Sequence, residues 1–131
     1  MILGVGIDLV EVGRIERSLA RFGDRFLRRI LAPAEAAYCR SLPWPATHVA
    51  VRFAAKEAIS KAFGTGIGRS LGWQDMEIRR EPSGQPTVVL HGPGRKLLDQ
   101  RGGRVVHVSL SHTAHHATAI AVLEGEGGGG D

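Results

Sequence analysis

The sequence predicts a single α+β domain. Helical patterns fill most of residues 11–63, alternating strand patterns fill most of residues 75–124, and one apolar strand-like segment precedes both. No internal repeat and no linker divides the 131 residues. A chain of this length is large enough to bury a core of its own.

Composition and charge narrow the classes of function. The hydrophobic fraction of 43% and the charged fraction of 23% are typical of a globular domain. The net charge of +4 favours an acidic partner: a phosphorylated ligand, an acidic protein or a nucleic acid. The single cysteine, Cys39, excludes an intrachain disulfide, and no apolar run reaches the length of a membrane span. Because Met1 leads into a strand-like segment instead of a signal peptide, we expect a cytoplasmic protein with no role at a membrane.

The first predicted element is a buried strand over residues 1–10, which are apolar with glycines at positions 4 and 6. In a strand, Asp8 shares one face with Gly6 and Val10. A buried aspartate is costly unless it binds something. Asp8 therefore either caps the following helix or serves as a ligand.

Two short helices are predicted next. Residues 11–22 carry apolar side chains at helical spacing, and after Gly23 a second helix begins with Asp24 as its N-cap. Arginine recurs along both helices, and few acidic residues lie between the arginines. This stripe is either a solvated face or a docking surface, and its composition favours docking; the arginines are at positions 14, 17, 21, 25, 28 and 29.

A short helix over 33–41 and a rigid turn lead into a long helix over residues 46–63, which Gly64 ends. Helical geometry places Ala54, Ala55, Ala58, Ile59 and Ala62 on a core face, and Lys56, Glu57, Ser60 and Lys61 on the opposite arc. Glu57 and Lys61 are surface neighbours. They form either an exposed ion pair or part of a metal and phosphate site, because the helix runs into a loop with glycines at 64, 66 and 68. The glycines follow the helix, which argues against a P-loop.

The second half is rich in predicted strands. Residues 75–81 and 87–91 form a hairpin through the turn at 82–86, and a short helix follows at 95–101. Strands over 104–112 and 117–124 end the domain. The glycine-rich tail, residues 125–131, is predicted to be disordered.

Two carboxylates stand out as metal ligands. Asp8 and Glu57 are the only acidic residues within otherwise apolar or small-residue elements, and two carboxylates with substrate phosphates are a common Mg²⁺ site. A zinc site is disfavoured because no cysteine pair accompanies the histidines, and alternation sends His107 and His112 to opposite faces. A Ser111–His112 nucleophile is weak for the same geometric reason.

Three blocks together resemble the holo-acyl-carrier-protein synthases, the small bacterial group of 4′-phosphopantetheinyl transferases. The blocks are residues 4–11 with Arg14–Ile15, residues 52–68 and residues 108–113; segments 25–31 and 84–86 also look similar. The resemblance covers residues 1–124. It implies one domain of 4′-phosphopantetheinyl transferase-like fold, with an antiparallel sheet wrapped around the central long helix. It also implies a homotrimer whose active sites lie between subunits.

The resemblance implies that the phosphopantetheine arm of coenzyme A is moved to a serine of an acidic acyl carrier protein, releasing adenosine 3′,5′-bisphosphate. Asp8 and Glu57 would hold Mg²⁺ as the cofactor. Lys61 would bind the pyrophosphate. Either Glu57 or a metal-bound water would take the serine proton.

The remaining implied roles concern coenzyme A and the carrier. Arg52, His112 and Thr113 would bind the 3′-phosphate, the turn from Gly84 to Pro86 would border the adenine, and Gly64 opens the loop that approaches the phosphates. The docking residues would be Arg14, Arg21, Arg25 and Arg29, with Phe26 as an apolar anchor.

The sequence departs from the family pattern in three places. Val51 replaces a usual glycine and His48 a usual aromatic residue, and residues 93–104 look like a surface insertion. Two other functions stay open. One is a Mg²⁺-dependent hydrolase of coenzyme A or another nucleotide. The other is a basic nucleic-acid-binding module, which leaves Asp8 and Glu57 without a role and has no recognisable motif.

Overall fold

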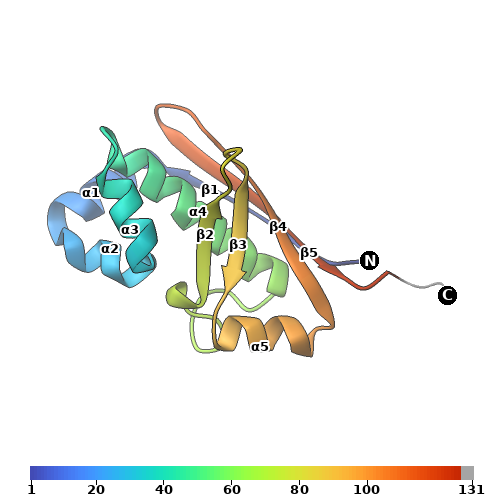
Figure 1. Ribbon diagram of the computed structural model, residues 1–131. Coiled ribbons are helices and arrows are strands. Elements are labelled where there is room, and N and C mark those ends of the chain that lie inside the picture. Colours follow the sequence, from blue (N-terminus) through green and yellow to red (C-terminus); the bar gives the residue numbers. More distant parts are fainter. Residues whose placement is uncertain (128–131) are drawn as a thin grey trace.

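The fold is built around one long helix. The computed structural model describes residues 1–127. Helix α4 (Pro45–Phe63) packs against a three-stranded antiparallel sheet, as Figure 1 shows. The strand order is β1–β5–β4, with β1 at Ile2–Glu11, β5 at His116–Gly125 and β4 at Gly103–His112. The predicted α+β fold and its central helix are confirmed.

The other elements cover the ends and the second side of α4. Three helices gather at one end of it: α1 (Val12–Phe22), α2 (Asp24–Ile30) and α3 (Pro33–Arg40). The hairpin of β2 (Met76–Arg80) and β3 (Pro86–Leu90) lies beside β4 and passes in front of α4 in Figure 1. The short turn η1 (Trp73–Asp75) contacts α2, and helix α5 (Pro93–Gln100) lies near the other end of α4. Within the described residues no helix is both long and apolar enough to cross a membrane.

Helix α4 is buried on more sides than its sequence predicts. The alanine-rich face is fully buried as expected, but Lys56 and Ser60 are also 0% exposed. The arc opposite the alanine-rich face is therefore not open to solvent at these two residues, because the neighbouring elements cover it. Glu57 is half-buried, and Lys61 is exposed.

Strand β1 crosses α4 at very short range, and glycine makes this possible. A Cβ at Gly4 would overlap the carbonyl oxygen of Ala62, and one at Gly6 would overlap that of Ala58. Two positions after Gly6 on the same face is Asp8, which is only partly exposed. The glycines therefore bring the strand and its aspartate directly against the helix that carries Glu57 and Lys61.

Three sequence-based details need correction. Asp24 is the first residue of α2 instead of its N-cap, and its carboxylate pairs with Arg40 at 2.9 Å. The last strand reaches Gly125, whose N–H donates to the carbonyl oxygen of Met1 at 2.8 Å, so this residue does not belong to a disordered tail. Residues 128–131 of the predicted tail lie outside the described residues. Segment 93–104 is no mere surface insertion, because Leu98 is 2% exposed in the core.

Candidate functional site

Asp8, Glu57 and Lys61 come together where β1 crosses α4. Lys61 Nζ donates to Asp8 Oδ1 at 3.2 Å and to the carbonyl oxygen of Ile7 at 3.0 Å. The hydroxyl of Thr118 on β5 donates to the carbonyl oxygen of Asp8 at 2.8 Å and fixes the strand there. The Asp8 side chain is 18% exposed and that of Lys61 is 52% exposed, so the cluster is open to solvent on one side. Lys61 pairs with Asp8. Among residues 1–127 it forms no ion pair with Glu57, although the two are four residues apart on the helix.

The two carboxylates repel each other. Burial raises the pKa of Glu57 above its ordinary value, and the nearby charge of Asp8 raises it further; Lys61 and Arg14 act in the opposite direction. Arg14 reaches this region from α1, with its guanidinium carbon 5.4 Å from the centre of the Phe53 ring. The cluster thus combines two carboxylates with two cations at a half-buried place.

This donor set fits a hard divalent cation. Mg²⁺ prefers one or two carboxylates together with phosphate oxygens and water, and a cation between Asp8 and Glu57 would relieve their repulsion. Among the described residues, no group of three His, Cys, Asp or Glu side chains is placed to hold a metal by itself. The substrate would therefore have to complete the coordination.

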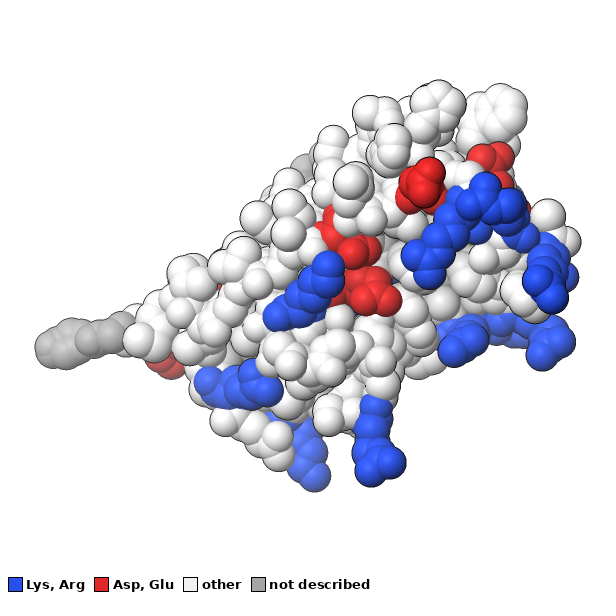
Figure 2. All heavy atoms as spheres, turned by 180° about the vertical axis from the view of Figure 1, so that it is seen from behind, with Lys and Arg blue, Asp and Glu red and all other residues white. Residues whose placement is uncertain are grey.

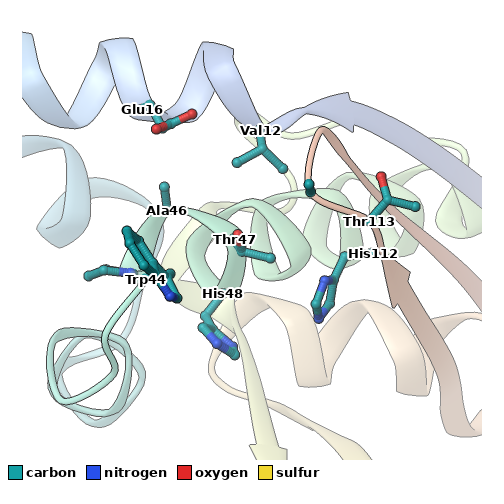
Figure 3. Close-up of a pocket in the computed structure, with 10 residues that line it drawn as sticks. Val12, Glu16, Trp44, Ala46, Thr47, His48, His112 and Thr113 are labelled. Atoms are coloured by element: carbon teal, nitrogen blue, oxygen red, sulfur yellow. The ribbon is translucent and has the colours of Figure 1, made fainter.

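His112 and Thr113 line a separate cavity of about 500 Å³. Figure 3 shows that its walls come from α1, from the start of α4 and from the turn between β4 and β5. The rings of His48 and His112 lie 6.2 Å apart and point in the same direction. Burial, helped by the positive charge of Arg52, lowers the pKa of His48. Trp44 stands at the rim with 78% of its surface exposed.

Arg52 lines a second cavity, of about 350 Å³, between α3 and the β2 strand. The residue is 3% exposed, and its guanidinium lies 4.9 Å from the centre of the Tyr38 ring. Its Nη1 donates to the carbonyl oxygen of His48 at 3.2 Å, and its buried Nε has no hydrogen-bond partner. His48 therefore connects the two cavities: it lines the cavity of His112, and its carbonyl oxygen accepts a hydrogen bond from Arg52. His112 and Arg52 do not line the same cavity.

Gly64 and Gly84 lie where the chain turns, as predicted. Gly84 and Pro86 line a groove of about 360 Å³ between the hairpin and β4, and Gly84 has a φ of 91° that favours glycine. Gly64 ends α4 in the left-handed conformation with a φ of 78°. The residues predicted to bind one coenzyme A molecule thus occupy several regions of this chain.

The docking residues are divided between two places. Arg25, Phe26 and Arg29 line a hollow of about 330 Å³ together with Ser18 and Phe22. Arg21 lies beside this hollow, with its guanidinium carbon 5.2 Å from the centre of the Phe22 ring. Arg14 instead reaches toward Phe53 and Glu57. Figure 2 shows a compact acidic patch with Lys and Arg side chains on both of its sides.

In the part of the chain that the structure describes, the histidines do not form a metal cluster. His107 Nε2 lies 2.7 Å from Glu124 Oε1 on the outer face of the sheet, whereas His112 faces the helix side. The predicted separation of the two histidines is confirmed.

Comparison with known proteins identifies the family. The family model described as 4′-phosphopantetheinyl transferase superfamily matches residues 4–121. The chain belongs to this superfamily. A holo-[acyl-carrier-protein] synthase of Koribacter versatilis is 52% identical over 124 residues, which are 95% of this chain and 99% of that protein.

Solved structures of the superfamily have the same fold. The holo-[acyl-carrier-protein] synthase of Neisseria meningitidis superposes with a TM-score of 0.89 at 35% identity, covering 95% of this chain and 99% of that chain. The synthase of Helicobacter pylori, solved in complex with coenzyme A, gives a TM-score of 0.82 at 35% identity, covering 92% and 99%.

Sequence reasoning missed one group of residues in this superfamily member. Lys56 is buried against Glu35. Glu35 lies between alanines, so the criterion that selected Asp8 and Glu57 also fits this residue, and it was overlooked. Tyr38 and Trp44 were also missed, although Pro43 and Pro45 mark a rigid turn around Trp44. A further signal was a lysine within an alanine-rich helix. Helical periodicity places Lys56 opposite the alanine face, but α2, α3 and η1 cover that side too.

Proposed function

We propose that this protein transfers the 4′-phosphopantetheine group of coenzyme A to a serine of apo-acyl carrier protein, releasing adenosine 3′,5′-bisphosphate. Membership of the superfamily and the names of its close relatives support this reaction. The observation that carries it is the cluster of Asp8, Glu57 and Lys61, where a half-buried carboxylate pair lies beside an ammonium group. These are the groups that a phosphoryl transfer requires.

Asp8, Glu57 and Lys61 would have separate roles at this cluster. Mg²⁺ bound by Asp8 and Glu57 would neutralise charge on the pyrophosphate. Lys61, held at the cluster by the carbonyl oxygen of Ile7, stabilises negative charge as the bond to the leaving phosphate breaks. The proton of the attacking serine would pass to Glu57 or to a water bound to the cation.

The phosphates of the adenosine part would bind at the histidine cavity and near Arg52. The cavity includes His112, Thr113 and the first turn of α4, whose positive end favours an anion. Arg52 has a buried Nε without a partner, and a phosphate could satisfy it only after a local adjustment. The hairpin groove at Gly84 and Pro86 would receive the adenine.

The proposed assembly is a homotrimer with its active sites between subunits. The outer face of the sheet exposes Val5, Ile7 and Leu9 at 56%, 62% and 66%, an area that a protein in water normally covers. Within one chain, the three cavities proposed to bind coenzyme A are separate, and none of them is lined by Asp8, Glu57 or Lys61. Packing of sheets between copies would cover the apolar face and bring regions of two chains together.

A mass measurement tests the reaction. The protein is incubated with apo-acyl carrier protein, coenzyme A and Mg²⁺, and the mass of the carrier is measured by mass spectrometry. We expect the carrier to gain one phosphopantetheine group, and no gain with a suitable carrier would refute the transfer. Breakdown of coenzyme A without a carrier gain would indicate the hydrolase instead. A salt-sensitive gel shift with DNA and no transfer would indicate the nucleic-acid module. The cytoplasmic location stays a prediction.

A further inference from the structure

Lys56 is a buried charged residue to which the proposed reaction gives no task. It is 0% exposed and directly precedes Glu57 on α4. Its ammonium group donates three hydrogen bonds: to the carbonyl oxygen of Ile30 at 2.6 Å, to Glu35 Oε1 at 2.7 Å and to the carbonyl oxygen of Trp73 at 3.2 Å. All three of its protons are thereby used.

Glu35 completes the network on the other side. Its Oε1 also accepts from the N–H of Ala32 at 2.8 Å, and its Oε2 accepts from the N–H of Ile78 at 2.9 Å. One buried ion pair therefore ties α4 to the end of α2, the start of α3, η1 and β2. A buried pair with every donor and acceptor satisfied holds its elements in one arrangement, and loss of either partner is costly.

A second side chain holds the same end of α2. Gln74 on η1 donates from Nε2 to the carbonyl oxygens of Arg28 and Leu31, each at 2.7 Å. The carbonyls of Arg28 and Ile30 belong to the last turn of α2, and that of Leu31 follows directly after it; helical hydrogen bonds are missing at this end. This short helix carries Arg25, Phe26 and Arg29, which line the proposed docking hollow.

We propose that Lys56 and Gln74 are positioning residues that fix the docking helix α2 relative to the Asp8–Glu57 cluster, so that the serine of a bound carrier reaches the phosphate under attack. This rests on the proposed transfer to an acyl carrier protein. The geometry supports it because Lys56 and Glu57 are adjacent on one rigid helix. A displacement of α2 would change where a carrier docks without changing the metal ligands themselves.

The sharpest variant is Gln74→Ala, because Gln74 is exposed and its loss leaves the core intact. We expect the KM for the carrier to rise about fivefold, as the loss of neutral hydrogen bonds permits, with the KM for coenzyme A and kcat unchanged. Amide hydrogens of residues 28–31 should exchange faster. The matched control is Gln100→Ala, an exposed glutamine on α5, which should leave every parameter unchanged.

The double variant Lys56→Met with Glu35→Gln tests the buried arm without leaving one charge unpaired. If near-ultraviolet circular dichroism shows that it is folded, its KM for the carrier should rise at least as much as that of Gln74→Ala. Transfer by the native protein is measured first, and its absence would refute the proposed function itself. If the native protein transfers the group but Gln74→Ala keeps the native KM for the carrier, or loses kcat and coenzyme A affinity instead, the positioning role is wrong.

Discussion

Asp8 and Glu57 place two negative charges at one half-buried location, and the protein balances them only partly. Lys61 contacts Asp8, while burial still raises the pKa of Glu57. Lys56 is the opposite case, because its charge is buried completely and fully paired with Glu35. Two lysines five positions apart on α4 therefore differ in role: one is structural and one remains available to a ligand.

The first prediction concerns Asp8. Asp8→Asn removes one of the two charges that would bind the cation, so we expect the transfer rate to fall about 100-fold or more. Thermal stability should not fall in parallel, because the repulsion between Asp8 and Glu57 disappears. Kinetics with coenzyme A and carrier and a thermal melt measure the two effects. Asp99→Asn, on the exposed surface of α5, is the control. Near-native activity of Asp8→Asn would disprove the carboxylate site.

The second prediction concerns stability against pH at Glu77. Arg79 Nε donates to its carboxylate at 2.8 Å and holds the pKa of Glu77 below its ordinary value; burial opposes this and the contact with His91 assists it. The unfolded chain lacks these contacts and binds the proton first as pH falls. The stabilisation is therefore complete above about pH 4.5 and is lost as pH falls through the lowered folded-state pKa.

Glu77→Gln should accordingly unfold at lower urea concentration than the native protein at pH 7. The difference between the two midpoints should shrink as the pH falls below about 4. Urea titrations at several pH values measure this. A constant difference across that range would show that the carboxylate's charge does not contribute.

At the scale of elements, the crossing of β1 over α4 determines the site. Gly4 and Gly6 have no Cβ, and this lets the strand lie against the carbonyl groups of Ala62 and Ala58. The close approach places Asp8 beside Lys61. A wider crossing would separate the carboxylates that the proposed cation must bridge.

The third prediction is that Gly6→Ala loses both stability and transfer. Its Cβ would overlap the Ala58 carbonyl oxygen and lie 2.7 Å from the nitrogen of Ala62, so the strand must move. We expect a destabilisation of about 1–3 kcal/mol, as for other overpacked cores. Gly13→Ala on α1 is the control, since its nearest new contact is the flexible end of Arg17 at 3.3 Å. Native-like urea denaturation of Gly6→Ala would contradict the close crossing.

The fourth prediction concerns the docking helix α2. Arg25→Glu reverses an exposed charge beside Phe26 and Arg29, so the KM for an acidic carrier should rise at least tenfold at low salt, in the range seen for charge reversal at interfaces. Coenzyme A affinity should stay unchanged. Because exposed charges are screened, the difference from native should narrow as salt increases. An effect on coenzyme A affinity alone would place Arg25 outside the carrier surface.

At the scale of the whole molecule, one face of the sheet packs on α4, and nothing within residues 1–127 covers the other face. Val5, Ile7 and Leu9 project from that outer face, and Ile120 of β5, opposite Ile7, is 39% exposed. Antiparallel sheets normally place polar residues on a solvated face. This face therefore supports the proposed homotrimer.

The fifth prediction tests that assembly. Ile7→Asp puts a charge in the centre of the outer face, so the assembly should dissociate and transfer should be lost if subunits share the site. Sedimentation equilibrium gives the mass of each species. Phe22→Asp changes an apolar residue on α1 that is 46% exposed, and it should keep the native mass. A native protein that sediments as a monomer would refute the trimer.

Much of the fold was predictable from local patterns. The long helix starts one residue before its predicted position and ends at Phe63 as predicted, and the strand order along the chain was also right. Asp8 and Glu57 stood out because a carboxylate among apolar or small residues is unusual. The arginine stripe followed from spacing and composition. The role of Arg52 and the choice of docking arginines within the stripe followed from resemblance, and the structure distributes them over different surfaces.

By itself, the sequence determined most of the elements and the identity of the carboxylate pair. These depend on periodicity and on residue chemistry, which are local. Only the tertiary structure decided that Lys56 is buried while Lys61 is open, because α2, α3 and the hairpin cover one side of α4 and leave the other to β1. It alone also revealed Glu35 and Gln74, whose hydrogen bonds join segments more than 20 and 40 residues apart in the chain. Such contacts have no local signal, since they arise only when distant elements pack together.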